Sequence, residues 1–525
     1  MAGRRFFAPT GRSQTDISGW IAQRAGWAPD DTALRFEGAD ISYAALEDRI
    51  GRTAGALDSV FDIGDGDRVA HLGVNAPEMI ELLFACARLD AIFVPLNSRL
   101  TVEEHLWQLQ DCGAAVLFVE PDYFDHAAEL AAALPELRLA TYAGDDPRWP
   151  ALERLRESAD PCPPALCADL RRPAKIVYTS GTTGRPKGAV LSQEALFYTA
   201  LNGQSVFEFT RADRILTAIP LFHVGGMNIQ TLPGLRAGAT ITLHRRFDPT
   251  AALNTLIEDR TTLLAVVPTM ARALFALPDF ADADLSSLRC VCMGSSSVPP
   301  PLFAPWHARG LPVNQVYGLT ESGPTAVALP IADGFARSAS AGKPVLHCAA
   351  KVVAGDSGRR APPGDMGEIW LRGPNLMSEY WGDPEATAET FTEDGWFRTG
   401  DLGRVDCDGF FFVEDRKTDM IVSGGENIYP AELERFLAET DDLAEFAVVG
   451  RPDETWGETP VCIVVPNPGA TVTEASVLSL FDGRLARYKR PRAVILTDNP
   501  LPRTPLGKVR KFELREALLA GRLGS

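Results

Sequence analysis

Lysine is scarce in this chain of 525 residues, which has eight lysines against 43 arginines. Arginine supplies nearly all the positive charge, whereas lysine offers a compact point charge that arginine cannot imitate. A lysine inside a glycine-rich stretch is therefore a candidate ligand for an anion. Basic charge is also in deficit, because the formal net charge is −18. Without a basic face, nucleic-acid binding is not expected.

Paired cysteines and long apolar runs are missing as well. The nine cysteines include no CxxC pair and no Cys/His spacing typical of zinc, so neither a disulfide framework nor a structural metal is expected. The apolar stretch 79–96 is interrupted by Glu81, Arg88 and Asp90, which predicts a buried helix and strand rather than a membrane span. The first twelve residues lack the apolar core of a signal peptide. We expect a cytoplasmic protein with no integral membrane segment.

Helical and strand patterns alternate through the first 400 residues, which predicts an α/β fold with mixed or parallel sheets. Residues 43–57 place apolar side chains on one helical face, and 114–119 read as a buried strand. The stretch 143–173, rich in Pro, Asp and Arg, reads as an irregular connection.

A different texture begins after Asp415. Pro430 can occupy the first turn of a helix, strand-like runs follow at 446–449, 461–465 and 493–496, and a helical pattern covers 476–485. These segments predict a small α+β unit. We therefore expect a large N-terminal domain (1–415), a hinge (416–419) and a small, mobile C-terminal domain (420–525).

The strongest local signal is Tyr178-Thr-Ser-Gly-Thr-Thr-Gly-Arg-Pro-Lys-Gly188, which follows a strand-like run. Its glycines allow the backbone to approach a phosphate, and its hydroxyls and Lys187 add hydrogen-bond donors. A Walker A loop is excluded, because no Gly-Lys-Ser/Thr follows at the required spacing. On composition alone, such a cluster is more typical of a flexible turn.

The amino-acid sequence of this loop resembles the phosphate loop of the acyl-adenylate-forming superfamily. That superfamily includes acyl-CoA synthetases, peptide-synthetase adenylation domains and beetle luciferases. Further motifs similar to that family follow in order: Pro220-Leu-Phe-His-Val-Gly-Gly226, Tyr317-Gly-Leu-Thr-Glu321, Arg398-Thr-Gly-Asp401, Asp415-Arg416, Ser423-Gly-Gly-Glu-Asn-Ile-Tyr-Pro430 and Pro502-Arg-Thr-Pro-Leu-Gly-Lys508. The resemblance spans residues 178–508 and is strongest to the acid–CoA ligases.

The resemblance implies a site for each substrate. The ATP and AMP site would comprise Thr179, Ser180, Gly181, Thr182, Thr183, Gly184, Lys187, Gly294, Ser295, Ser296, Tyr317, Gly318, Asp401 and Arg416. The acid pocket would comprise His223, Val224, Gly225, Met227 and Gly318. Coenzyme A (CoA) would bind near Gly424, Gly425 and Asn427. Catalysis would rest on Lys508, Thr320, Glu321 and His223.

Each implied role has a physical basis and a simpler rival. Asp401 offers two acceptor oxygens for ribose hydroxyls, though it could be an ordinary turn residue. Glu321 is a hard oxygen ligand for Mg²⁺ bound to ATP, or a solvated helix-start residue. Tyr317 could stack on adenine, or belong to the core. Lys508 could neutralise charge as a carboxylate attacks the α-phosphate, or lie in a basic surface tail.

The acid pocket can be read only in part. Small and apolar residues surround His223, whose rival interpretation is a satisfied core histidine, and no arginine lies beside Tyr317. Amino-acid-activating relatives carry an aspartate near this histidine, so an amino-acid substrate is not expected. A hydrophobic monocarboxylic acid, fatty or aryl, fits best.

The C-terminal motifs imply two arrangements of one enzyme. Lys508 is needed against ATP, whereas the segment around Gly424 is needed for the CoA step, and the family's hinge position is Thr418 here, where relatives usually carry Asp or Lys. Three alternatives stay open: an acyl-AMP ligase that loads a carrier protein, a luciferase-like oxygenase, and an inactive binding module. The sequence leaves the assembly open, with a homodimer as one option.

Overall fold

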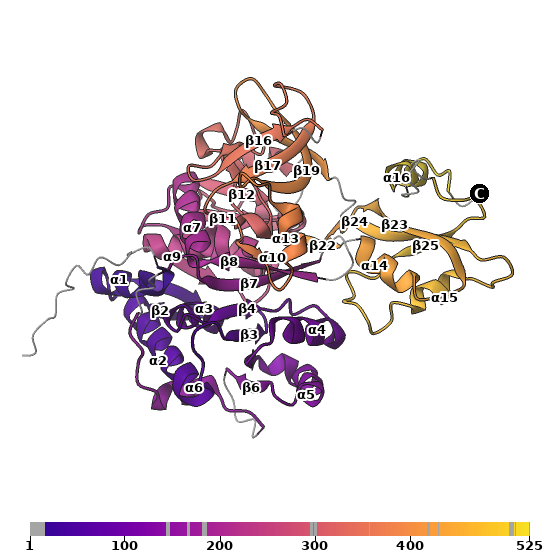
Figure 1. The fold of residues 1–525 in the computed structure, drawn as a ribbon. Helices are drawn as coiled ribbons and strands as arrows, with labels where there is room; N and C mark the ends of the chain where they lie inside the picture. Colours follow the sequence, from indigo (N-terminus) through magenta and orange to yellow (C-terminus); the bar gives the residue numbers. More distant parts are fainter. Residues whose placement is uncertain are drawn as a thin grey trace, which may run out of the picture.

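The computed structural model describes residues 16–142, 148–164, 169–180, 186–294, 298, 302–355, 358–416, 421–428, 430–502, 509 and 511–523. A large part built on three sheets ends near Arg416, and a smaller part built on a fourth sheet stands to one side of it (Figure 1). This arrangement confirms the predicted fold class. The hinge at 416–419 stays a prediction, because 417–420 lie outside the described residues.

The largest sheet has nine strands in the order β15-β14-β13-β12-β11-β9-β10-β1-β2. Its six central strands are parallel, so their carboxyl ends meet at one edge. The strands are β1 (Thr32–Phe36), β2 (Ala39–Ser42), β9 (Arg214–Thr217), β10 (Thr240–Leu243), β11 (Leu263–Val266), β12 (Cys290–Gly294), β13 (Val313–Tyr317), β14 (Val327–Ala328) and β15 (Lys343–Pro344).

A second sheet has seven strands in the order β18-β8-β7-β4-β3-β5-β6. Strand β8 is antiparallel to both of its neighbours, β7 and β18. The strands from β7 to β6 in this order are parallel to one another. The strands are β3 (Arg68–Leu72), β4 (Ile92–Pro95), β5 (Val116–Val119), β6 (Arg138–Thr141), β7 (Pro173–Ser180), β8 (Pro186–Ser192) and β18 (Glu379–Tyr380).

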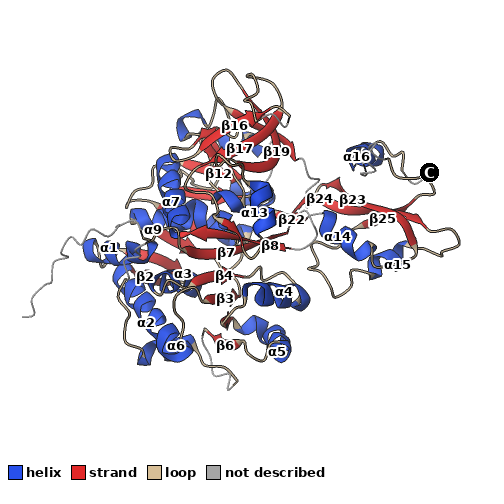
Figure 2. Cartoon of the chain, viewed as in Figure 1, coloured by secondary structure: helices blue, strands red, loops and turns tan. Residues whose placement is uncertain are grey.

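Helices fill the space between these two sheets and cover the outer face of the second (Figure 2). The main core joins residues of both sheets to α1 (Trp20–Trp27), α2 (Tyr43–Phe61), α3 (Pro77–Arg88), α7 (Gln193–Phe207) and α9 (Leu232–Ala237). The opposite face of the second sheet packs against α4 (Val102–Cys112) and α5 (Phe124–Ala133). The other helices of this part are α6 (Leu152–Ser158), α8 (Val224–Gly226), α10 (Pro249–Glu258), α11 (Pro268–Phe275), α12 (Ala304–His307) and α13 (Pro384–Thr390).

The third sheet has four antiparallel strands and lies at the top of Figure 1. The strands are β16 (Ala349–Val353), β17 (Gly367–Arg372), β19 (Phe397–Val405) and β20 (Phe411–Arg416).

The C-terminal part has its own sheet and its own two cores. Its strands are β21 (Ile421–Ser423), β22 (Glu426–Ile428), β23 (Leu443–Asp453), β24 (Gly457–Pro466) and β25 (Ala493–Leu496), and its helices are α14 (Pro430–Leu437), α15 (Glu474–Ser479) and α16 (Lys511–Leu519). We call residues 421–523 the C-terminal unit.

Local predictions fare unevenly. The helix at 43–57 is confirmed as α2, and the strand at 493–496 as β25. The irregular stretch 143–173 is wrong in part, because it contains α6, which packs against α2. The helix at 476–485 is also wrong in part: α15 ends at Ser479, and Gly483 downstream has a positive φ of 73°. Over the described ranges, no helix is both long and apolar enough to cross a bilayer.

Candidate active site

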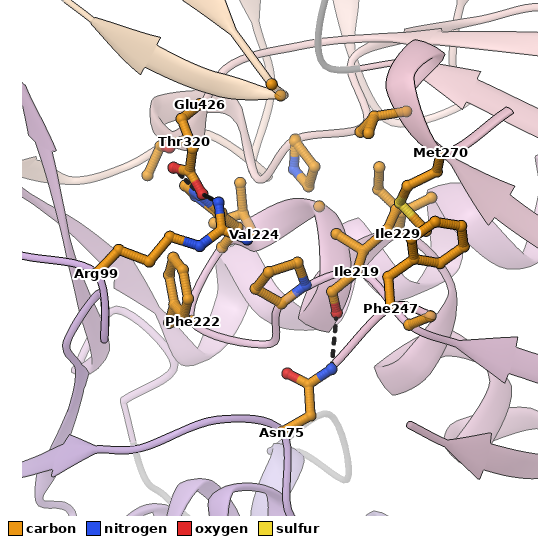
Figure 3. A pocket seen from close by; sticks show the side chains of 18 of the residues that line it. Asn75, Arg99, Ile219, Phe222, Val224, Ile229, Phe247, Met270, Thr320 and Glu426 are labelled. Carbon is orange, nitrogen blue, oxygen red and sulfur yellow. Dashed lines mark hydrogen bonds and ion pairs between the residues drawn. The ribbon is translucent and has the colours of Figure 1, made fainter. Parts of the chain in front are cut away.

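A cavity of about 450 Å³ lies where the carboxyl ends of β9, β11 and β13 meet (Figure 3). This is the edge at which parallel α/β sheets usually bind ligands, because the loops after the strands converge there. The C-terminal unit also lines the cavity, through Gly424, Gly425 and Glu426. The predicted acid pocket and the predicted CoA segment therefore share one cavity.

A tight hairpin brings the C-terminal unit to this cavity. Ser423 pairs with Glu426 across a two-residue turn, in which Gly424 and Gly425 have φ values of 59° and 83°. Positive φ at both positions of a two-residue hairpin strongly favours glycine. A Cβ at Gly425 would lie 3.3 Å from a methyl group of Val267, so the turn sits directly against the end of β11.

An ion-pair cluster fixes the hairpin over the acid pocket. Nε2 of His223 lies 2.9 Å from Oε2 of Glu426, and the guanidinium of Arg99 binds the other oxygen of that carboxylate. Glu426 is almost fully buried. Although burial opposes ionisation, the neighbouring His223 and Arg99 hold the pKa of Glu426 below its usual range. His223 is thus a partner of the C-terminal unit and not an isolated core histidine.

The predicted acid-pocket residues divide into two groups. His223, Val224, Gly225 and Gly318 line the cavity. Gly318 has no room for a side chain, because a Cβ there would lie 1.7 Å from a backbone oxygen of Pro324. Met227 is a correction: it lies fully buried in the main core, and Ile229 lines the cavity in its place. Residues two positions apart on a helix face opposite ways, so only one of the two can reach the cavity.

One end of the cavity has apolar walls. They are formed by Ile219, Ile229, Phe247 and Met270, and the apolar Val267 and Val316 also line the cavity. In Figure 3 the side chains of Ile219, Ile229, Phe247 and Met270 gather at one side of the cavity, away from Arg99 and Glu426. Two arginines also line the cavity, and each has an acidic partner: Arg245 pairs with Glu120, and Arg246 lies 3.7 Å from Asp122.

The predicted phosphate and magnesium residues approach one another across β8 and β18. Oε1 of Glu321 accepts a hydrogen bond of 3.0 Å from the hydroxyl of Tyr380. Nζ of Lys187 lies 5.2 Å from the centre of the same ring. Thr179, Thr320 and Glu321 line the cavity. Tyr380 therefore links the end of the predicted phosphate loop to the predicted metal ligand.

The predicted adenosine residues also meet. The hydroxyl of Tyr317 donates a hydrogen bond of 2.8 Å to Oδ2 of Asp401, which is buried. Arg416 faces Asp401 across the ladder of β19 and β20. Gly294 ends β12, next to the end of β13 in the same sheet.

Several predicted site residues cannot be placed. Gly181, Thr182, Thr183, Gly184, Ser295, Ser296, Thr418 and Lys508 lie outside the described residues, and for Ser180, Arg416 and Asn427 the description covers the backbone alone. Their roles remain predictions. Among the described residues, no group of three or more His, Cys, Asp or Glu side chains is placed to hold a metal ion.

Sequence reasoning did not single out Tyr380, Phe247, Met270, Arg99 or Glu426. Glu426 stands inside the quoted Ser423–Pro430 motif, so a signal for it was available. The other four lie in segments without a recognisable motif. The packing of distant segments brings Arg99, Phe247 and Met270 to the cavity, and the pairing of β18 with β8 brings Tyr380 to Glu321.

Comparisons with known proteins agree with this geometry. Residues 21–381 match the AMP-binding enzyme family, and residues 432–508 match the AMP-binding enzyme C-terminal domain. An indoleacetate–CoA ligase from Aromatoleum aromaticum is 47% identical over 502 residues, covering 95% of this chain and 98% of the relative. A feruloyl-CoA synthase from Amycolatopsis is 43% identical over 499 residues, covering 95% of this chain and 98% of the relative.

One solved relative also informs the position of the C-terminal unit. The o-succinylbenzoate CoA synthetase of Bacillus subtilis, as a double mutant with a CoA product analogue, matches with a TM-score of 0.84 and 32% identity, covering 95% of this chain and 98% of the relative. The same enzyme with its acyl-adenylate intermediate matches with a TM-score of 0.69 and 31% identity, covering 97% and 99%. Because the two differ little in sequence, the scores report a difference in conformation. The chain belongs to the AMP-binding enzymes, in the acid–CoA ligase branch of the adenylate-forming superfamily.

Proposed function

We propose that this acid–CoA ligase activates a hydrophobic monocarboxylic acid with an aromatic ring. The observation that carries this proposal is the apolar end of the cavity, where Phe247 and Met270 offer an aromatic face and a polarisable thioether. Arg245 and Arg246 already have acidic partners, so a second carboxylate on the substrate would lack a counter-charge. The similarity to indoleacetate–CoA and feruloyl-CoA enzymes supports an aryl acid over a simple fatty acid.

In the first half-reaction, the carboxylate oxygen attacks the α-phosphate of ATP, and pyrophosphate leaves. Two anions must approach each other in this step, so positioned positive charge lowers the barrier. We assign that role to Lys508 together with Lys187. Asp401 and Tyr317, already joined by a hydrogen bond, would hold the ribose and adenine of the acyl-AMP product.

ATP and CoA are the co-substrates of this reaction class, and Mg²⁺ is the metal we propose for it. The one acidic ligand we assign is Glu321, one of whose oxygens is held by Tyr380. A hard carboxylate oxygen suits Mg²⁺, which commonly takes its other ligands from phosphates and water. The metal would neutralise the developing charge on pyrophosphate.

In the second half-reaction, the CoA sulfur attacks the acyl carbon, the thiol loses its proton, and AMP leaves. We propose that the arrangement described above, in which the Gly424–Gly425 turn lines the cavity, serves this step. The greater similarity to the complex with the CoA product analogue supports this assignment. Thr418 remains our candidate for the pivot, and we propose a cytoplasmic location. The assembly stays open, with a homodimer as one option.

Pyrophosphate release from Mg·ATP tests the function. The acids should be indole-3-acetate, phenylacetate, 4-hydroxycinnamate, hexanoate, octanoate and one dicarboxylate, each with and without CoA. We expect release that depends on an aryl acid and that turns over repeatedly only with CoA. Release that stops near one turnover despite CoA would point to a carrier protein as the acyl acceptor. A preference for octanoate would overturn the aryl assignment and leave the reaction class intact.

A further inference from the structure

A buried ion pair outside the cavity joins the two parts of the chain. Nζ of Lys489, in the C-terminal unit, lies 2.7 Å from Oε1 of Glu104 in the first turn of α4. The same Nζ lies 2.8 Å from Oε1 of Glu432. All three side chains are at least nine-tenths buried. Neither Glu104 nor Lys489 lines the cavity.

The two carboxylates differ in where they belong. Glu432 lies on α14, within the same unit as Lys489, so this pair travels with the unit. Glu104 belongs to the large N-terminal part, so its bond to Lys489 exists only while the unit rests against α4. A contact present in one arrangement and absent from another shifts the balance between the two by its own free energy. Glu104 is thus the member of the cluster that can favour one arrangement.

The side chain of Glu104 is also held in position for Lys489 by the start of its own helix, α4. Its Oε2 accepts hydrogen bonds from the backbone N–H and the hydroxyl of Thr101, at 2.9 and 3.0 Å, in a capping box. These bonds fix the carboxylate and leave Oε1 turned toward Lys489. Little side-chain freedom remains to be lost when the C-terminal unit arrives, so docking costs less entropy than with a mobile glutamate.

Weaker contacts around this ion pair also join the large N-terminal part to the C-terminal unit. The amide of Asn97 donates to the hydroxyl of Tyr488 at 3.3 Å, and the hydroxyl oxygen of Thr101, whose proton goes to Glu104, lies 3.4 Å from the carbonyl oxygen of Arg484. Glu103 lies 4.0 Å from Nε of Arg484, at the exposed margin. The segment 97–104 therefore forms a dock for residues 484–489, with the Glu104–Lys489 pair as its buried centre.

We infer that Glu104 is a positioning residue for thioester formation: by binding Lys489 it holds the C-terminal unit where the Gly424–Gly425 turn closes the cavity. This inference rests on the proposed two-step function. Adenylation, which we assign to a different position of the unit, does not need this bond. Loss of the bond should therefore slow the CoA step and leave the ATP step largely intact.

The variant Glu104→Gln isolates the ion pair. Glutamine at this position can still complete the capping box, so α4 keeps its first turn, while the charge facing Lys489 is lost. The matched control is Glu157→Gln, which makes the same chemical change at an exposed position of α6, outside the segment 97–104. Glu104→Asp is the second variant, because it keeps the negative charge and withdraws it from Lys489 by one methylene group.

Both half-reactions should be measured separately in single-turnover experiments. Adenylation is followed by pyrophosphate release, and thioester formation by mixing CoA with enzyme and the purified acyl-AMP of the best acid. For Glu104→Gln we expect roughly a 10-fold slower CoA step, less than about a 2-fold change in adenylation, and the same melting temperature as Glu157→Gln. Glu104→Asp should slow the CoA step by a smaller factor.

Equal loss of both steps, or no loss in either, would overturn the inference. If Glu104→Gln melts early, the Asp variant decides the matter by the same comparison. Failure of the proposed function has a different signature: the unchanged enzyme would then release no pyrophosphate with any acid, or would form no acyl-CoA.

Discussion

Nε2 of His223 and Oε2 of Glu426 lie 2.9 Å apart, although 203 positions separate the two residues in the chain. One residue opens the helix that lines the acid pocket, and the other closes a hairpin of the C-terminal unit. The acid pocket is therefore in direct contact with the C-terminal unit through His223. A histidine in contact with both the substrate region and the unit can couple the two.

Glu426→Gln should weaken the closed arrangement. A glutamine can bond to His223 but cannot form an ion pair with Arg99, which would be left near a neutral amide. We expect thioester formation to slow about 10-fold, because a partly buried charge loses its partner. The measurement is CoA-dependent consumption of acyl-AMP, with Glu445→Gln on β23 as a control. An unchanged rate would show that this contact does not hold the hairpin.

Lys508→Ala should abolish most adenylation while sparing the second step. Removing a group that neutralises transition-state charge typically costs about 10²–10³-fold in rate. The comparison is between acid-dependent pyrophosphate release and acyl-CoA formation from supplied acyl-AMP. A similar loss in both would contradict the role assigned to this lysine, and Lys511→Ala controls for the nearby positive charge.

Tyr380→Phe should raise the magnesium requirement of the first step. The phenol hydroxyl is the donor that orients Oε1 of Glu321, and a phenylalanine keeps the ring beside Lys187. We expect a several-fold higher Mg²⁺ concentration for half-maximal pyrophosphate release, since outer ligands typically tune metal affinity by about 10-fold or more. A Mg²⁺ titration at saturating acid checks this. Tyr198→Phe, which changes a tyrosine on α7, is the control.

Lys175→Met should stabilise the protein. Lys175 on β7 is fully buried, its amino group has no hydrogen-bond partner among the residues that the structure describes, and desolvation lowers its pKa from 10.5 to about 7. Between these two values the unfolded chain binds the proton and the folded chain does not, so lysine-dependent stability rises with pH across that window. Methionine removes the penalty, and we expect the free energy of unfolding to increase by ~2–4 kcal/mol at pH 7.

Denaturant unfolding at several pH values tests this point. The gain from methionine should shrink as the pH rises from 7 toward 10, because removing the proton of Lys175 on folding costs less free energy as the pH approaches its unfolded pKa of 10.5. Lys343→Met, at an exposed position, should show no such trend. A gain that does not vary with pH would mean that the burial cost of Lys175 is already relieved.

The sequence predicted the order of the motifs and the chemistry they bring together, because short motifs fix local turns and strand ends. Tyr317 and Asp401 are joined by a hydrogen bond, and Thr179 and Glu321 line one cavity, while the roles assigned to these four residues stay predictions. The sequence could not predict which apolar side chains face the cavity, because that depends on how the helices pack against the core. Met227 and Ile229 are both apolar and two positions apart, and only the position of the helix against the core decides which one faces the cavity.

Contacts between distant segments were equally out of reach. No motif near Tyr380 indicates its contact with Glu321, since that contact arises from the pairing of β18 with β8. Glu104 reads as an ordinary capping residue of a surface helix, and it does act as one. Its second bond, to Lys489, appears only when the C-terminal unit docks.

The cavity takes part of its wall from the C-terminal unit, through the turn at Gly424 and Gly425. An acyl-AMP is a mixed anhydride that water can destroy, so its lifetime on the enzyme depends on how often this turn leaves the opening. The rate of ATP consumption without acyl-CoA formation then reports the position of the C-terminal unit. In the absence of CoA, the rate of acyl-AMP hydrolysis should therefore increase with the fraction of time that the turn is away from the cavity.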